Sequence, residues 1–317
     1  MHIVVVDPSR TVRRLLTQQL EAGGYVSHAF DDAAEALACV KNNPEVGVVI
    51  TSIMPSMAGL ELCWETRLLA TRRPMYIIVM AAASERHMRI EALDSGADDF
   101  INKPFAAEEL YARLRAAERV GKLQRELIEL ATFDSLTGVL NRRAFFARAA
   151  EACAAAEAGM GLTAIMLDVD LFKQVNDRHG HDVGDAVLCA VAKTGAEQAA
   201  IFGRLGGEEF ALLLEGVTPE YALAFAEQLR CRMATLDFIG SHGVFRVTCS
   251  FGLAEWQPGD SIDRLLKRAD MALYEAKSSG RNRVVVSPCD RHRQDVPPPD
   301  VPPSRFVRNE ERYGSGM

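Results

Sequence analysis

Two acidic segments of this chain carry residue types that could bind a metal ion and a phosphate. The segment 204–210 reads Arg-Leu-Gly-Gly-Glu-Glu-Phe, and residues 168–170 read Asp-Val-Asp. A glycine pair lets a hairpin turn tightly and lets a ligand approach the backbone. Carboxylates suit a hard divalent cation such as Mg²⁺, which usually binds together with phosphates. Alone, the first segment fits a hairpin with a solvated acidic tip equally well.

Apolar runs must position these carboxylates. Residues 163–167 precede the Asp-Val-Asp segment and residues 211–214 follow the glycine segment, and both runs are typical of buried strands. A helical pattern runs from Ala186 to Lys193, after the strand 163–167 and the acidic segment that follows it. Carboxylates at the end of a buried strand lie over a sheet edge, where α/β proteins collect ligands.

Five spaced blocks give a more specific indication. They are residues 134–143, 168–185, 204–210, 250–252 and 269–282. In this order they resemble the GGDEF family of diguanylate cyclases, in its Gly-Gly-Glu-Glu-Phe form. The resemblance covers roughly residues 132–286, about half of the chain. It implies a C-terminal α/β domain with a central, mostly antiparallel sheet.

The resemblance implies an activity and a set of site residues. The reaction joins two GTP into cyclic di-GMP and releases two pyrophosphates, with Mg²⁺ (or Mn²⁺) as the cofactor. The implied catalytic residues are Glu208, Glu209 and Asp168. The implied metal ligands are Asp168, Glu208 and the carbonyl of Val169. The implied substrate-binding residues are Phe172, Lys173, Asn176, Asp185, Gly206, Gly207, Lys277 and Arg281.

Within that set the resemblance gives each group a task. Asn176 and Asp185 would recognise guanine. Its adjacent N1–H and N2–H₂ donors suit a carboxylate, and adenine does not offer such a pair of donors. Lys277 and Arg281 would hold the terminal phosphates, and the backbone N–H groups of residues 172–173 would assist them. One site holds one GTP, so we expect a homodimer with the product forming between two copies.

The first part of the chain alternates apolar runs with amphipathic helices. The expected strands are Ile3–Val6, Val46–Ile50, Tyr76–Met80 and Asp99–Ile101. The expected helices are Thr11–Gly23, Ala33–Asn42, Gly59–Ala70, Glu85–Ser95 and Ala107–Arg119. This pattern predicts a flavodoxin-like, doubly wound α/β domain. Through its residues 5–7, 54–59 and 103–105 it resembles the receiver domain of response regulators.

Departures from the receiver pattern predict that this domain takes no phosphate. Thr51 stands at the phosphoacceptor position, and no acid lies between Glu45 and Glu61. Pro8 replaces the second metal-binding acid and Ala81 the usual Ser/Thr, which leaves Asp7 and Lys103. A hydroxyl cannot form an acyl phosphate, and one carboxylate makes a poor Mg²⁺ site. We expect a receiver fold kept for contact with an unknown protein partner.

The composition of the chain supports a division into domains and excludes several classes of function. We expect a receiver-like domain over 1–118, a linker helix over 119–131, a cyclase domain over 132–287 and a disordered Pro-rich tail over 288–317. Seven scattered cysteines favour a reducing cytoplasm. A net charge of −7 without a basic face argues against nucleic-acid binding. No apolar run is long enough for a membrane span.

Two questions stay open at this level. Apolar residues three or four apart run from Leu110 to Leu130. The first half of this seam fits packing on its own domain, and Val120–Leu130 favours a short parallel coiled coil with a second copy.

The C-terminal domain is predicted to be a GTP-dependent cyclase. Alternatives are a catalytically inactive GGDEF module for signalling or protein docking, and a cyclase that also takes ATP, against which Asp185 argues.

Overall fold

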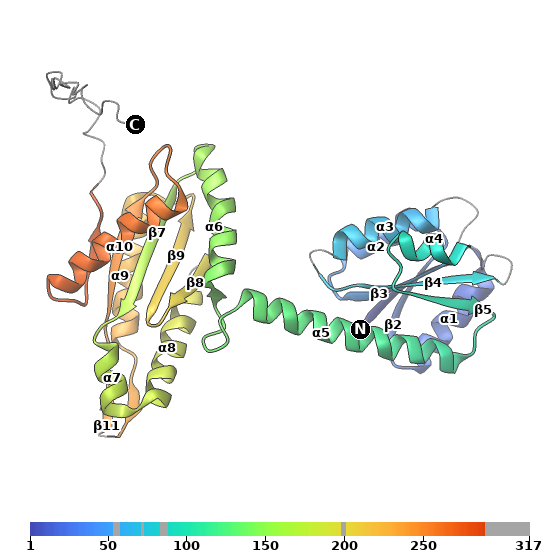
Figure 1. Ribbon diagram of the computed structural model, residues 1–317, viewed down its shortest axis with the longest axis horizontal. Helices are drawn as coiled ribbons and strands as arrows, with labels where there is room; N and C mark the ends of the chain where they lie inside the picture. The colour runs from blue at the N-terminus through green and yellow to red at the C-terminus, as the bar shows by residue number, and fades with distance from the viewer. Residues whose placement is uncertain (53–57, 71–72, 83–87, 198–200, 242, 289–317) are drawn as a thin grey trace, which may run out of the picture. The chain divides into compact units, whose positions relative to one another are not determined.

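The chain folds into two compact units, Met1–Phe133 and Asp134–Met317 (Figure 1). The computed structural model describes residues 1–52, 58–70, 73–82, 88–197, 201–241 and 243–288. The prediction of a disordered tail over 288–317 falls almost wholly outside these residues. Each unit has its own sheet and its own cores.

The N-terminal unit is a parallel five-stranded sheet in the order β2-β1-β3-β4-β5. Its strands are β1 His2–Val6, β2 Val26–Phe30, β3 Val46–Ser52, β4 Tyr76–Ala82 and β5 Asp99–Lys103. The central strands are almost continuously apolar because both faces of the sheet are covered. The flavodoxin-like, doubly wound fold predicted from the sequence is confirmed.

Helices cover both faces of this sheet. They are α1 Arg10–Ala22, α2 Ala33–Asn42, α3 Ala58–Ala70, α4 Arg89–Asp94 and α5 Ala107–Thr132. One core joins α1 and α5 to the sheet through Leu16, Leu20, Leu110 and Leu114. The helices α2, α3 and α4 pack on the other face. The carboxyl ends of all five strands therefore share one open edge.

Three expectations for this unit need correction. The strand β2 was not predicted, because Val26–Phe30 lies at the sheet edge and contains Ser and His instead of an apolar run. The helix expected over Glu85–Ser95 is only Arg89–Asp94 among the described residues, since residues 83–87 lie outside them. The helix expected over Ala107–Arg119 and the linker helix expected over 119–131 are one continuous helix that ends at Thr132.

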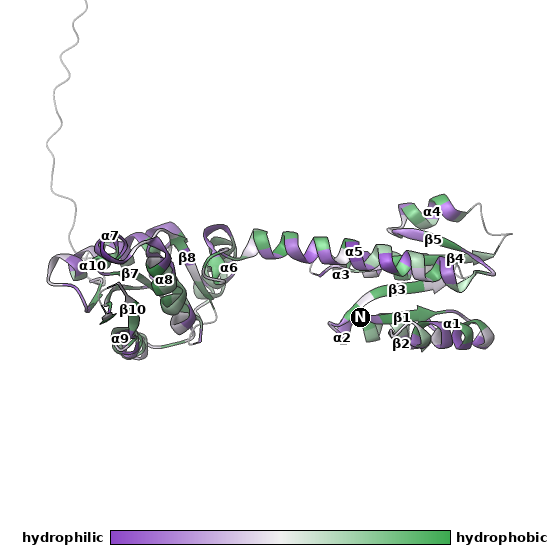
Figure 2. Ribbon diagram, turned by 90° about the horizontal axis from the view of Figure 1, so that it is seen from below, coloured by the Kyte–Doolittle hydropathy of each residue, from purple (hydrophilic) through white to green (hydrophobic). Residues whose placement is uncertain are grey.

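The long helix α5 changes character along its length. Leu110, Leu114 and Ala117 are buried in its own unit, as the sequence predicted for the first half of the seam. Leu127 and Leu130 are 65% and 70% exposed. Figure 2 shows hydrophobic and hydrophilic residues alternating along this helix. The second half therefore presents an apolar seam that its own unit does not cover.

The C-terminal unit is built on a six-stranded sheet in the order β13-β12-β7-β9-β8-β6. Its strands are β6 Leu140–Asn141, β7 Leu162–Val169, β8 Ile201–Gly206, β9 Glu209–Glu215, β12 Cys249–Glu255 and β13 Val284–Val286. The central strands pair antiparallel, and the two outermost pairs are parallel. The predicted mostly antiparallel sheet is thus confirmed.

Helices cover both faces of this second sheet as well (Figure 1). They are α6 Arg142–Glu157, α7 Phe172–His179, α8 His181–Ala196, α9 Pro219–Ala234 and α10 Ile262–Ser278. A separate hairpin joins β10 Phe238–Gly240 to β11 Gly243–Phe245. The helices α7, α8 and α9 contribute to one core, and α6 and α10 contribute to the other. Among the described residues, no helix has both the length and the apolar character that crossing a membrane requires.

Candidate functional site

The hairpin β8–β9 carries the glycine pair at its tip. Gly207 has φ of +53°, a left-handed conformation that glycine adopts without steric strain. Arg204 stabilises the turn, because its Nε donates a hydrogen bond to the Gly207 carbonyl at 2.8 Å. Its Nη1 also donates to Asp134 Oδ1 at 3.0 Å. The turn that carries Glu208 is therefore tied to the start of the domain.

The sheet register brings the two acidic segments together. Asp168 near the end of β7 pairs with Glu209 at the start of β9, so Glu208 and Glu209 lie at the same edge of the sheet as Asp168. Asp168 is only 5% exposed. Lys277 from α10 places its Nζ 2.8 Å from Asp168 Oδ2. Residues from three parts of the sequence thus meet at one point.

The electrostatics of Asp168 fit a site that is completed by a cation. Burial raises the pKa of Asp168 to about 6, although the hydrogen bond and charge of Lys277 lower it. The negative charges of Glu208 and Glu209 raise it further. A carboxyl group in this position gives up its proton more readily when a divalent cation is near.

The oxygen donors at this edge fit Mg²⁺. Asp168 and Glu208 supply two carboxylates, and Val169 supplies a backbone carbonyl at the end of the same strand. Mg²⁺ commonly takes one or two protein carboxylates and fills its other positions with phosphate and water. In the described part of the chain, no group of three or more His, Cys, Asp or Glu side chains could hold a metal ion. A site here would therefore depend on the substrate phosphates.

The start of α7 lies directly after this edge. Leu171 precedes the helix with φ of +58°, and Phe172 and Lys173 form its first turn. The first N–H groups of a helix have no partner within the helix and attract anions. Lys173 is exposed and adds a positive charge beside them. The predicted backbone contacts of residues 172–173 with phosphate are thus geometrically available.

The helices α7 and α8 approach each other closely at Asn176. A Cβ at Gly184 would lie 1.9 Å from Asn176 Oδ1, so this close approach requires glycine. Asn176 Oδ1 is buried and has no hydrogen-bond partner among the described residues. Asp185 follows Gly184 on α8 and is exposed. An unpartnered buried oxygen beside a carboxylate fits a ligand that brings hydrogen-bond donors, as guanine does.

The last predicted phosphate contact comes from the turn after α10. Arg281 is exposed there and has φ of +61°. It lines a cleft of about 500 Å³ together with Asp170 and Leu171, which lie between β7 and α7. The turn and the β7–α7 connection are therefore neighbours in space.

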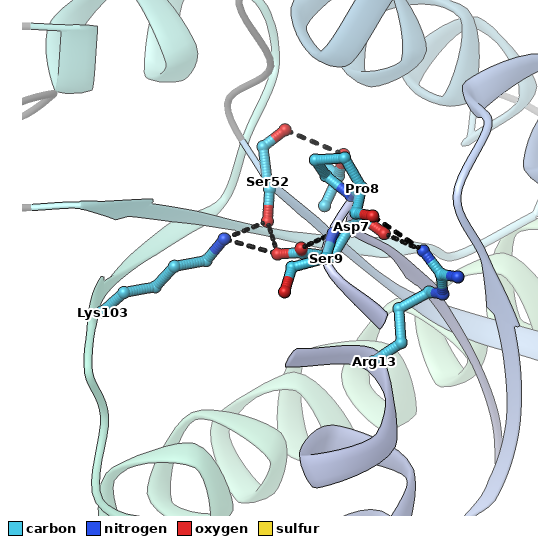
Figure 3. A network of polar contacts seen from close by, with 7 residues as sticks. Asp7, Pro8, Ser9, Arg13, Ser52 and Lys103 are labelled. Atoms are coloured by element: carbon cyan, nitrogen blue, oxygen red, sulfur yellow. Dashed lines mark hydrogen bonds and ion pairs between the residues drawn. The ribbon is translucent and has the colours of Figure 1, made fainter. Parts of the chain in front are cut away.

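The receiver-like unit has a different network at the carboxyl ends of its strands (Figure 3). Asp7 is buried and pairs with Lys103 Nζ, and it also accepts a hydrogen bond from the Ser52 hydroxyl. Lys103 in turn donates to Ser52 Oγ at 2.7 Å. Thr51 is fully buried at the predicted phosphoacceptor position. The remaining acid and the remaining lysine thus neutralise each other.

Sequence reasoning missed or misplaced several of these contacts. It gave no role to Arg204, Asp134 or Arg142. The structure pairs Asp134 with Arg204, and the Arg142 guanidinium lies 5.4 Å from the ring centre of Phe146. The position of Arg204 in the glycine segment was the available signal. Ser52 was missed because it follows the phosphoacceptor position and is not part of the receiver pattern.

Comparisons with known proteins give a family for each of the two units. The family model "Diguanylate cyclase, GGDEF domain" matches residues 131–283, and the model "Response regulator receiver domain" matches residues 3–115. Response regulator PleD of Caulobacter vibrioides is 32% identical over 297 residues, which are 89% of this chain and 65% of PleD. Diguanylate cyclase DgcM of Escherichia coli is 30% identical over 90% of this chain and 66% of DgcM. The chain thus spans slightly less than two thirds of the length of these relatives.

One solved structure extends the likeness to three dimensions. The coiled coil and GGDEF domain of DgcB from Caulobacter crescentus, in complex with c-di-GMP, aligns with a TM-score of 0.53 and 33% identity. The alignment covers 56% of this chain and 97% of the DgcB chain. The chain belongs to the GGDEF family of diguanylate cyclases. Its GGDEF domain follows a response regulator receiver domain.

Proposed function

We propose that this protein is a diguanylate cyclase, which converts two GTP into cyclic di-GMP and two pyrophosphates across a dimer. The observation that carries the proposal is the meeting of Asp168, the Glu208–Glu209 pair and Lys277 at one sheet edge. Carboxylates for a metal and an ammonium for phosphate are the groups that a phosphoryl transfer requires.

The residues of this chain would bind and orient GTP. Asn176 and Asp185 would accept from the guanine N–H groups, which fixes the base between α7 and α8. The N–H groups of residues 172–173, with Lys277 and Arg281, would hold the phosphates. Glu209, opposite Asp168, adds a further carboxylate whose charge acts on the metal position. Gly206 and Gly207 leave the tip of the hairpin open to the nucleotide.

Mg²⁺ (or Mn²⁺) would be held by Asp168, Glu208 and the Val169 carbonyl. When bound, it would neutralise phosphate charge and favour ionisation of the attacking 3′-hydroxyl group. The 3′-hydroxyl of each GTP attacks the α-phosphorus of the other, so two copies must face each other. The exposed seam of α5 supports such pairing, because leucines at this spacing bury their side chains against a second helix.

The receiver-like unit would act as a protein-binding regulator without aspartyl phosphorylation. The Asp7–Lys103 pair supports this role, because the lysine already occupies the carboxylate that would bind Mg²⁺. The partner that binds this unit is a protein of unknown identity. Incubation with acetyl phosphate should give no hydroxylamine-labile phosphate in residues 1–118, and its detection there would refute this part of the proposal.

We also place the protein in the cytoplasm. All six described cysteines are free thiols, and their scattered positions suit a reducing compartment. The nucleotide substrate is available there.

The test is pyrophosphate release from GTP in the presence of Mg²⁺. The Glu208→Ala and Asp168→Ala variants each lose one carboxylate of the metal site and should be slower by orders of magnitude. Glu215→Gln is a matched control, because Glu215 is exposed at the other end of β9. Near-normal release by either folded variant would refute the metal assignment.

A further inference from the structure

The second acid of the Asp-Val-Asp segment has a different environment from the first. Asp170 is only 6% exposed. Its Oδ1 accepts from the Ser250 hydroxyl at 2.7 Å, and its Oδ2 accepts from the Thr248 hydroxyl at 2.6 Å. The same Oδ2 accepts from the backbone N–H of Asn282 at 3.0 Å. Both carboxylate oxygens are thus used inside the protein, so Asp170 is not poised as a metal ligand.

The N–H of Asn282 belongs to an unusual turn. Gly280, Arg281 and Asn282 have φ values of +123°, +61° and +46°. Left-handed backbone is unfavourable for residues with a Cβ, and two such residues in succession persist only when the surroundings hold them. The hydrogen bond to Asp170 acts on the second of these two residues. A buried carboxylate therefore holds a backbone conformation that the local sequence disfavours.

Other contacts hold the remaining sides of this turn. Arg281 N–H donates to the Ala276 carbonyl at 3.0 Å, which joins the turn to α10. The Arg230 Nη1 donates to Asn282 Oδ1 at 2.7 Å, which joins it to α9. The bond from Asn282 to Asp170 joins it to the β7–α7 connection, where Asp168 and the first turn of α7 lie. Asp170 therefore links the two segments to which the proposed function assigns phosphate contacts.

We propose that Asp170 is a positioning residue, which fixes the Gly280–Asn282 turn so that Arg281 reaches the terminal phosphates of a nucleotide bound at the start of α7. The inference rests on the proposed function, because the phosphate contact of Arg281 is part of it. It goes further by assigning Asp170 a task separate from metal binding. The carboxylate acts through Arg281 and does not touch the nucleotide.

The test measures nucleotide binding without turnover. The full chain is titrated with 3′-deoxy-GTP and Mg²⁺, which cannot react because the attacking hydroxyl is missing, and separately with GMP. Asp170→Ala should weaken binding of the triphosphate about fivefold to tenfold and that of GMP less than twofold. Arg281→Ala should give the same pattern. The double variant should bind the triphosphate no worse than Arg281→Ala alone, since both changes remove one interaction.

Asp170→Asn is the matched control. Its Oδ1 can accept from Thr248 and Asn282, and its Nδ2 can donate to the Ser250 hydroxyl oxygen, which also accepts. This variant should therefore bind the triphosphate within twofold of the unmodified protein. A loss equal to that of Asp170→Ala would show that the charge matters and would overturn the positioning role.

Two further results would contradict the proposal. Equal losses for GMP and the triphosphate would indicate general damage to the site, and additive losses in the double variant would show that Asp170 and Arg281 act independently. If Asp170→Ala does not fold, Thr248→Val takes its place, because it removes one of the three donors with little change in shape. It should weaken binding of the triphosphate more than binding of GMP, by a smaller factor than Asp170→Ala. If Thr248→Val binds each nucleotide as tightly as the unmodified protein does, the proposal would then be refuted.

These outcomes are distinct from failure of the proposed function. If the unmodified protein binds GTP but forms no cyclic di-GMP, the cyclase activity is refuted. The binding selectivity would still test whether Asp170 acts through Arg281. If product forms normally but the double variant is additive, only the positioning role is refuted.

Discussion

Two opposing effects act on the pKa of the Asp168 side chain. Burial raises its pKa to about 6 while Lys277 lowers it, and the ordinary pKa of this carboxyl group in an unfolded chain is 3.8. Between these two pH values the folded protein keeps a proton that the unfolded chain has released. Stability without a divalent cation should therefore fall as pH rises from about 4 to 6 and then level off.

Asp168→Asn should remove this pH dependence. Above pH 6, in a chelator, we expect the variant to be more stable than the unmodified protein by up to roughly 3 kcal/mol, the upper limit for a shift of about two pKa units. Near pH 4 the two should be equal. Urea unfolding at both pH values measures this difference, and a variant less stable at pH 8 would contradict the assigned cause.

Asp185 and Asn176 set the expected choice of base. Asp185→Asn replaces an acceptor by an amide that also donates, which leaves one guanine donor without a partner. We expect GTP binding to weaken by about 1–3 kcal/mol. Calorimetric titration with 3′-deoxy-GTP measures the effect, and unchanged affinity would exclude Asp185 from base recognition.

The buried pair in the receiver-like unit makes a stability prediction. Lys103→Met would leave Asp7 without a cation in a site where it is 1% exposed. Loss of one partner of a buried pair costs about 3–5 kcal/mol, and the partial exposure of Lys103 should reduce this to about 2–4 kcal/mol. The double variant Asp7→Asn, Lys103→Met should be less destabilised than Lys103→Met alone. Urea unfolding that ranks the two variants the other way would contradict this account.

At the scale of elements, α8 and α9 bear on feedback by the product. The resemblance to the GGDEF family implies an inhibitory product-binding motif, Arg-x-x-Asp, which begins nine residues before the glycine pair. This chain has Glu197-Gln198-Ala199-Ala200 there. Glu197 pairs with Arg232 of α9 at 2.8 Å, and residues 198–200 lie outside the described residues. An acid at this position should repel an anionic dinucleotide.

We therefore expect micromolar cyclic di-GMP to leave the initial rate nearly unchanged. The substitutions Glu197→Arg and Ala200→Asp together restore both residues of the motif and should introduce inhibition. A titration of the unmodified protein that gives strong non-competitive inhibition with a submicromolar midpoint would reveal another inhibitory site.

The elements also show how far sequence reasoning reached. Strands with continuous apolar runs, such as β1, β3 and β7, were found because burial on both faces leaves a clear pattern. The edge strand β2 was not found, because it lacks an apolar run. The helix over 119–131 was predicted, but not that it continues the preceding helix without a break. The groups at the metal position were named from motif resemblance. The ties from Arg204 and Asp170 depend on residues more than 60 positions apart, which no local pattern contains.

At the scale of the whole molecule, the proposed reaction needs two GGDEF units, because each would supply groups for one GTP. The exposed apolar seam on the second half of α5 is the feature that would bring two copies together. Burial of about four leucine-sized side chains per helix would favour a dimer through the hydrophobic effect. Activity per molecule should then rise with protein concentration until the dimer is complete.

The most direct test of the central claim is the identification of the product formed from GTP and Mg²⁺ over a range of protein concentrations. Chromatography with mass spectrometry should show cyclic di-GMP and two pyrophosphates for each product molecule. The rate per molecule should increase with concentration, and Glu208→Ala should form almost none. Pyrophosphate release without cyclic di-GMP, or no reaction at any concentration by folded protein, would contradict the account.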